Sequence, residues 1–216
     1  VAMKAVYFDG ENGEDVRTEA IPEELKEQAQ EQRHAMLESL TMYSDSLMEK
    51  LLSEEAVSDD EIHAVVKTAV QNQSITPVFC GSAYKNKGVQ PLLDAVNRYL
   101  PSPLDRSVSA KIWDNPEETF DLAADDSKPA VAMAFKIVDD PYGQLTFMRI
   151  YQGTLAKGEG YYNQRTQQKQ RFSRIVRMHS DKREEIDTAG AGDIVAVMGV
   201  DTASGDTYAA ENKYCS

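Results

Sequence analysis

The fold of the first half of the chain is decided by the stretch ITPVFCGSAYKNKGVQPLLDAVNRYL, which spans residues 75–100. Its first six residues are apolar and β-prone, and they predict a short strand even though Pro77 lacks one ladder donor. Gly81-Ser82-Ala83 ends this strand, and the residues that follow predict a loop. From Val89 onward apolar side chains recur at helical spacing, until Pro101 stops the helix. This order of strand, loop and helix is typical of an α/β unit.

Upstream of this unit the sequence predicts a small hairpin and two helices. Short β-prone runs at 4–8 and 16–20 flank a glycine-containing turn and predict the hairpin. An apolar stripe with spacings of three, four or seven predicts a helix over about 23–52, and a break near 43–46 is left open. The string SDDE at 58–61 has the pattern of a capping box, which predicts a second helix over about 59–72.

Downstream of residue 100 the pattern changes twice. Residues 101–128 contain several prolines and an acidic pair but few periodic apolar residues, so we expect a linker there. From Pro129 onward short β-rich runs alternate with turn residues, which predicts an all-β barrel or sandwich. Its expected strands lie at 131–138, 145–152, 160–163, 170–178 and 194–200. The chain is therefore expected to fold as two modules.

The composition is typical of a globular protein. Of 216 residues, 41% are hydrophobic and 27% are charged, which is close to the average for folded domains. No apolar run approaches the ~20 residues of a membrane span, and the first residues lack the pattern of a signal peptide. We therefore expect a soluble, cytoplasmic protein with no membrane partner. Two cysteines, Cys80 and Cys215, and three histidines are too few for a disulfide framework or a zinc cluster.

The formal charge of −13 is unevenly distributed along the chain. Residues 1–77 contain 6 Lys and Arg against 17 Asp and Glu, whereas residues 129–216 contain 11 of each kind. This pattern indicates either a basic partner for the first part or simply a well-solvated surface. One basic run in the last part could neutralise phosphates or could face water. It consists of Arg165, Lys169, Arg171, Arg174, Arg177, Lys182 and Arg183.

Catalytic motifs are missing from the sequence. It contains no phosphate-binding loop of the form G-x-x-x-x-G-K-[ST]. The glycine pairs at 158–160 and 190–192 lack the third glycine and the strand-to-helix setting of a dinucleotide site, so we interpret them as turns. The three histidines are not paired in sequence with a serine or cysteine nucleophile. We therefore predict no catalytic residue in this chain.

Several long strings of the chain resemble translation elongation factor G, a family of ribosomal translocase GTPases. They are residues 80–103, AFKI at 134–137, residues 143–153, RFSRIVRMHSDKREEI at 171–186, residues 191–196 and GDT at 205–207. These strings are specific, and they are spread over nearly the whole chain. The resemblance therefore extends to both expected modules.

The resemblance implies that the chain is a fragment of such a factor. Residues 1–100 would be the C-terminal part of the GTPase domain, including a helical insert at about 1–74. Residues 129–216 would be the β-barrel second domain, after the linker at 101–128. The expected fold class is thus an α/β remnant with a helical insert, followed by an all-β barrel of translation-factor type.

The resemblance also places a nucleotide site in the first module. Gly81, Ser82 and Ala83 would form the last guanine-recognition loop, with Lys85 nearby. The phosphate loop, the switch segments and the N-K-x-D sequence of the family are absent from this chain. GTP with Mg²⁺ is therefore expected in the whole factor. This chain alone is expected to bind no nucleotide and to be inactive as a GTPase.

The first ribosomal partner implied by the resemblance is the stalk protein of the large subunit. It would meet the long helix of the insert. Glu27, Glu31 and Glu38 lie on that helix at spacings of four and seven, which puts them on one side. We expect these carboxylates to face lysines of the stalk protein, although acidic helix surfaces often only face water.

The second implied partner is small-subunit ribosomal RNA, which would contact the barrel. The basic run contains few aromatic side chains for stacking, so we expect phosphate contacts rather than base recognition. If 170–178 is one strand, its alternation puts Lys169, Arg171 and Arg177 on one face and Arg174 on the other. The first three are the predicted RNA contacts.

Two other interpretations remain open at this point. The chain could come from a related ribosomal GTPase, such as a ribosomal protection protein or a release factor. It could also be a stand-alone module that binds RNA or protein. A phosphate-loop sequence upstream in the same reading frame would distinguish an enzyme from a module.

Overall fold

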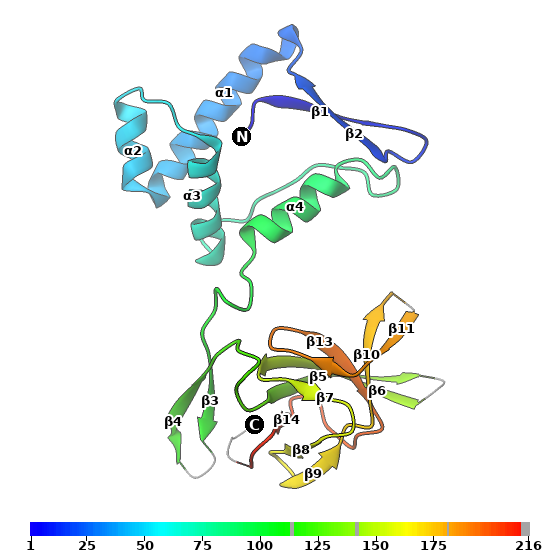
Figure 1. Cartoon of the computed structure of the whole chain (residues 1–216). Helices are drawn as coiled ribbons and strands as arrows, with labels where there is room; N and C mark the ends of the chain where they lie inside the picture. Colours follow the sequence, from blue (N-terminus) through cyan, green and yellow to red (C-terminus); the bar gives the residue numbers. More distant parts are fainter. Residues whose placement is uncertain (113–114, 141–142, 181, 213–216) are drawn as a thin grey trace. The chain divides into compact units, whose positions relative to one another are not determined.

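The computed structural model describes residues 1–112, 115–140, 143–180 and 182–212. The chain divides into two compact units, Val1–Pro101 and Ser102–Ser216 (Figure 1). Each unit has a hydrophobic core of its own. Cys215 lies outside the described residues. In the part of the chain that is described, no helix is long and apolar enough to span a membrane.

The first unit contains the hairpin that the sequence predicts and splits the first predicted helix in two. β1 (Lys4–Asp9) and β2 (Asp15–Ala20) pair in antiparallel fashion. The stretch 23–52 forms α1 (Glu23–Leu40), a 3-10 turn at Thr41–Tyr43 and α2 (Asp45–Leu52). The break occurs because the Ser44 hydroxyl accepts a hydrogen bond from the Leu47 amide (3.2 Å) and so caps a new helix.

The next two helices confirm their predictions. α3 (Asp59–Gln71) begins at the capping box, in which the Ser58 hydroxyl accepts from the Glu61 amide and the Glu61 carboxylate accepts from the Ser58 amide. α4 (Val89–Tyr99) follows the loop. The apolar faces of the helices meet in one core, made by Leu37, Leu40, Leu47, Val57, Ile62, Val66, Ala95 and Tyr99.

The strand expected at 75–80 is not formed, and this prediction was wrong. A strand exists only through hydrogen bonds to a neighbour, and among the described residues no strand lies beside this segment. Its side chains are correspondingly open, with Val78 85% and Phe79 42% exposed. The first unit therefore keeps the loop and the helix of the predicted α/β unit without its strand.

The second unit begins with a β-hairpin at residues that we expected to be a linker. β3 (Val108–Ile112) and β4 (Asn115–Leu122) pair in antiparallel fashion. The linker predicted at 101–128 is thus corrected over this stretch. The sequence did not predict these strands because the stretch is rich in prolines and acidic residues, and both are uncommon in sheets. The hairpin forms because Ala110, Phe120 and Leu122 pack against the main sheet.

The main sheet has eight antiparallel strands in the order β11-β10-β13-β6-β5-β14-β8-β9. They are β5 (Val131–Asp140), β6 (Gly143–Gln152), β8 (Gly160–Asn163), β9 (Gln168–Arg171), β10 (Arg174–His179), β11 (Lys182–Ile186), β13 (Ile194–Met198) and β14 (Thr207–Ala209). β7 (Leu155–Ala156) pairs with β12 (Thr188–Ala189). The all-β prediction is confirmed. No ladder joins β11 to β9 within the described ranges, so closure of the expected barrel is not detected.

Phe172 lies in the core of the second unit and interrupts the strand expected at 170–178. Its fully buried ring lies 4.8 Å from the ring of Tyr161 and 5.2 Å from that of Tyr208, measured between centroids. Its amide donates to the carbonyl of Glu159 (2.9 Å), and its carbonyl accepts from Gly158 (2.7 Å). The chain therefore forms two strands, β9 and β10, where the sequence indicated one.

A buried carboxylate connects β8 to the segment before β14. Asp206 is 2% exposed and accepts hydrogen bonds from Asn163 Nδ2 (2.8 Å), the Ala203 amide (2.8 Å) and Arg165 Nε (2.6 Å). Burial disfavours the charged form, but these donors outweigh burial and hold the pKa of Asp206 well below its usual range. Arg165, the first residue of the basic run, is engaged in this pair.

We predict that Asp206→Ala lowers the free energy of unfolding of the second unit by about 3 kcal/mol, because it leaves buried donors without an acceptor. The exposed Asp139→Ala serves as control and should change it by less than about 0.5 kcal/mol. Because the pKa of Asp206 is lowered on folding, its contribution is complete above about pH 4 and is lost as the pH falls further. Calorimetry from pH 7 to pH 3 measures this. If the difference in free energy of unfolding between Asp206→Ala and the parent chain were the same at pH 7 and at pH 3, the assignment would be contradicted.

Candidate functional site

The predicted guanine-recognition loop is a tight turn closed by main-chain hydrogen bonds. The Ser82 amide donates to the Lys87 carbonyl (2.8 Å), and the Lys87 amide donates to the Ser82 carbonyl (3.0 Å). Gly88 then leads into α4 with a φ of +81°, and a Cβ atom there would lie 2.9 Å from the carbonyl oxygen of Cys80. Only glycine fits at this position. The shape of the loop is therefore a property of its own sequence.

The predicted site residues on this loop are accessible to a ligand. Gly81, Ala83 and Lys85 are exposed, and Ser82 is half-buried. Together they offer main-chain amides and carbonyls, one hydroxyl and one ammonium group. Such a set can form hydrogen bonds to a planar base, but it is no cradle for a chain of phosphates. In the described ranges no group of three or more His, Cys, Asp or Glu side chains could hold a metal ion.

The acidic face predicted on the long helix is present on α1. Glu27, Glu31 and Glu38 are all exposed, whereas Leu37 and Leu40 on the opposite side lie in the core. Glu38 lies 3.3 Å from His34 in an i,i+4 pair. Within the described residues no ion pair engages Glu27 or Glu31. These two carboxylates are therefore available to a basic partner.

The predicted RNA contacts lie on two strands rather than one. Lys169 and Arg171 are on β9, at one end of the sheet order. The Lys169 ammonium lies 5.3 Å from the centroid of the Tyr162 ring, and Arg171 Nε donates to the Gly158 carbonyl (2.8 Å). The basic run is thus divided into separate groups, because the chain leaves the sheet at Phe172.

The sheet register corrects the expected alternation. Arg174 lies on the side of the sheet opposite the core residue Ile175, the side that also carries Val176 of a second buried cluster, whereas Arg177 shares the side of Ile175. On β9, Lys169 and Arg171 also point outward, because the residue between them pairs with the core residue Tyr161. We expected Arg177, and not Arg174, to share the side of Lys169 and Arg171. The interruption at Phe172 shifts the alternation by one residue.

Arg177 also differs from the β9 pair in its environment. Its Nη2 lies 3.6 Å from Oδ2 of Asp193, so its charge is partly neutralised inside the unit. Both side chains are roughly half-exposed. An exposed ion pair of this kind costs little to open, so the guanidinium could still reach an anionic partner.

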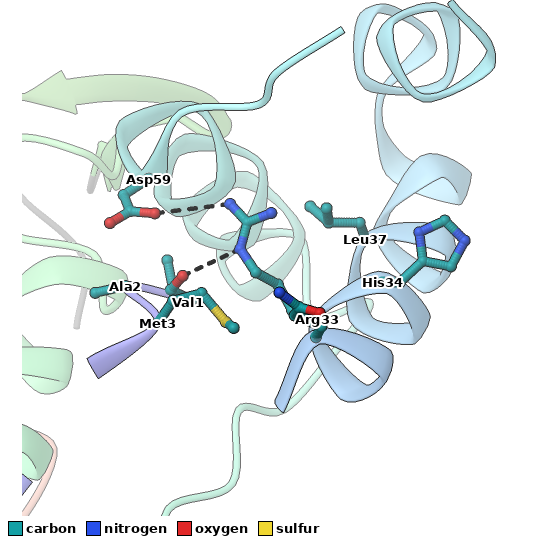
Figure 2. Close-up of a pocket in the computed structure, with 8 residues that line it drawn as sticks. Val1, Ala2, Met3, Arg33, His34, Leu37 and Asp59 are labelled. Carbon is teal, nitrogen blue, oxygen red and sulfur yellow. Dashed lines mark hydrogen bonds and ion pairs between the residues drawn. The ribbon is translucent and has the colours of Figure 1, made fainter. Parts of the chain in front are cut away.

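A polar residue that the sequence analysis did not identify lines a cavity of about 490 Å³ in the first unit (Figure 2). Arg33 reaches from α1 to the carbonyl of Val1 (3.2 Å), the carbonyl of Val57 (3.2 Å) and the carboxylate of Asp59 (3.8 Å). The sequence signal was a charge among the apolar residues of the core-facing stripe. Since Nε and Nη2 of Arg33 are engaged by these groups, we interpret Arg33 as a connection between α1 and the start of α3.

Comparison with known proteins gives consistent matches. The sequence pattern described as Elongation factor Tu domain 2 matches residues 143–209. Elongation factor G from Rhodopirellula baltica is 61% identical over 216 residues, which is 100% of this chain and 31% of the relative. Elongation factor G 1 from Desulfotalea psychrophila is 50% identical over 100% of this chain. The chain thus spans about a third of the length of these relatives.

A solved structure supports the fold. A crystal structure of a protein from Thermus thermophilus matches 97% of this chain and 28% of that protein, with a TM-score of 0.71. The sequence identity in this match is 23%, so the likeness concerns the fold alone.

Proposed function

Because the chain corresponds over its whole length to one segment of elongation factor G, we propose that it works as part of a ribosome-dependent GTPase that moves tRNA and mRNA during protein synthesis. The observation that carries the proposal is the 61% identity over all 216 residues. GTP and Mg²⁺ belong to the whole factor. The general test is GTP hydrolysis by the whole factor with and without ribosomes, and no stimulation by ribosomes would refute the proposal.

The proposed roles divide between the two units. Residues 1–100 contribute the end of the GTPase domain, with the hairpin and helices of 1–74 as an insert, and the sheet of the second unit is the domain after it. In this assignment Gly81, Ser82, Ala83 and Lys85 contact the guanine base. The closed shape and the exposure of the loop support this role.

We predict that this chain by itself shows no measurable affinity for GTP at micromolar concentrations. Phosphate binding needs a glycine-rich cradle with its lysine, and one loop that contacts the base cannot replace it. Isothermal titration calorimetry with the chain and with the whole factor compares the two directly. Micromolar binding by the chain would contradict the assignment.

The acidic face of α1 is proposed to contact the stalk protein of the large ribosomal subunit. Three exposed carboxylates on one side of a helix create a negative surface, which attracts lysines and speeds association at low salt. The free carboxylates of Glu27 and Glu31 support this role more than Glu38 does, because Glu38 already lies beside His34.

We predict that Glu27→Lys combined with Glu31→Lys slows stalk-stimulated GTP hydrolysis by the whole factor about 3- to 10-fold at low salt. Glu117→Lys with Glu118→Lys changes the net charge equally, at exposed positions of β4, and should leave the rate unchanged. The difference should shrink as salt is added. Equal rates for the two double variants at low salt would mean that the α1 face only meets water.

The outer side of β9 is proposed to contact the phosphates of small-subunit RNA through Lys169 and Arg171, with Arg177 on β10 as a further contact. Two exposed cations on adjacent outward positions of one strand can reach neighbouring phosphates. Arg177 must first separate from Asp193. We therefore expect a larger contribution from the β9 pair.

We predict that Lys169→Ala with Arg171→Ala reduces the slope of log affinity for the ribosome against log salt by roughly one to two units. For each phosphate contact that is removed, binding releases about one counterion fewer. Arg177→Ala should reduce the slope by about one unit or less. Affinity of the whole factor measured across a salt series gives both slopes. A slope unchanged in the double variant would show that β9 does not contact RNA.

A further inference from the structure

The turn of the β1–β2 hairpin lies against the Ser82–Lys87 loop (Figure 1). The contact is made by Gly13, which is buried although it lies in the turn of a two-stranded hairpin. A Cβ atom built at Gly13 would lie 2.6 Å from the carbonyl oxygen of Lys85 and 3.0 Å from that of Asn86. Two main-chain segments therefore touch with no room for a side chain between them.

Neither side of this contact can move away easily. On the loop side, Lys85 and Asn86 lie inside the turn that the two hydrogen bonds between Ser82 and Lys87 close. On the hairpin side, six residue pairs form the ladder that joins β1 to β2. The hairpin turn is thus packed directly against the backbone of the loop.

The hairpin is further stiffened by Arg17. Its guanidinium donates to Asp9 (3.0 Å) and to Glu19, and it lies 4.6 Å from the centroid of the Tyr7 ring. All four residues belong to β1 or β2. The contacts of Arg17 with Asp9 and with the Tyr7 ring join the two strands, so we expect part of a displacement at Gly13 to be transmitted to the loop.

We propose that the β1–β2 turn is a positioning element for the Ser82–Lys87 loop and that Gly13 is its positioning residue. Any side chain at Gly13 pushes the Lys85 and Asn86 carbonyls outward and so moves the groups that would meet the base. The functional half of this inference rests on the role proposed above for Gly81–Lys85 in binding guanine nucleotides. The structural half concerns this chain alone.

The test compares Gly13→Ala with Gly10→Ala, a matched control in the same turn. Both glycines have positive φ, +64° at Gly13 and +87° at Gly10, so alanine strains the backbone at either position. At Gly10, however, a Cβ atom would meet only the end of the Glu14 side chain, which can rotate away. The two variants therefore differ in the contact with the loop. Gly13→Asn is a third variant, because asparagine tolerates positive φ and still introduces the clash.

Two measurements distinguish an effect on the loop conformation from an effect on nucleotide binding. Nuclear magnetic resonance of this chain follows the amide signals of Ser82 and Lys87 without any nucleotide. Fluorescence titration of the whole factor with a labelled GDP follows affinity. We expect Gly13→Ala and Gly13→Asn to shift both amide signals and to weaken GDP binding about tenfold, whereas Gly10→Ala leaves the signals unshifted and the affinity within about twofold.

Each result decides one half of the inference. Unshifted Ser82 and Lys87 signals in a folded Gly13→Ala chain would overturn the positioning role. Shifted signals with unchanged GDP affinity would overturn the proposed contact between the loop and guanine, while the positioning role would stand. Equal effects of Gly10→Ala and Gly13→Ala would show that backbone strain, and not the clash with the loop, is responsible.

Discussion

Every main-chain amide and carbonyl that leaves water needs a hydrogen-bond partner, and the way each segment finds one determines the rest of this structure. Ser82 and Lys87 pair with each other and close a loop. The segment 75–80 pairs with no strand among the described residues and so forms no strand itself. Phe172 bonds to Gly158 and Glu159 instead of continuing its strand, and its ring thereby enters the core.

The surfaces proposed to meet partners follow from the same packing. Leu37 and Leu40 occupy the buried side of α1, so the carboxylates at helical spacing on the other side must face water. On β9, the inward position pairs with a core residue, and the cations on either side point outward. Charged and buried side chains thus lie on different sides of each element, with a repeat of about 3.6 residues in the helix and of about two in the strand.

Local signals made part of this structure predictable from the sequence. The capping box at Ser58 and Glu61 fixed the start of α3, because both partners lie within one turn. The hairpin β3–β4 could not be found this way, since its stability comes from packing on distant residues such as Val131. The loop at Gly81–Lys85 was identified by resemblance to a family. Gly13 was not identified, because its constraint comes from backbone far along the chain.

The packed hairpin turn contrasts with the connection between α2 and α3, and this difference matters for where a foreign peptide can be introduced. Residues 53–56 are all exposed, and their neighbours on both sides are anchored by the cap at Ser58 and the end of α2. A reporter tag inserted between Glu55 and Ala56 would extend into solvent. The same tag in the β1–β2 turn would have to displace the backbone of Lys85 and Asn86.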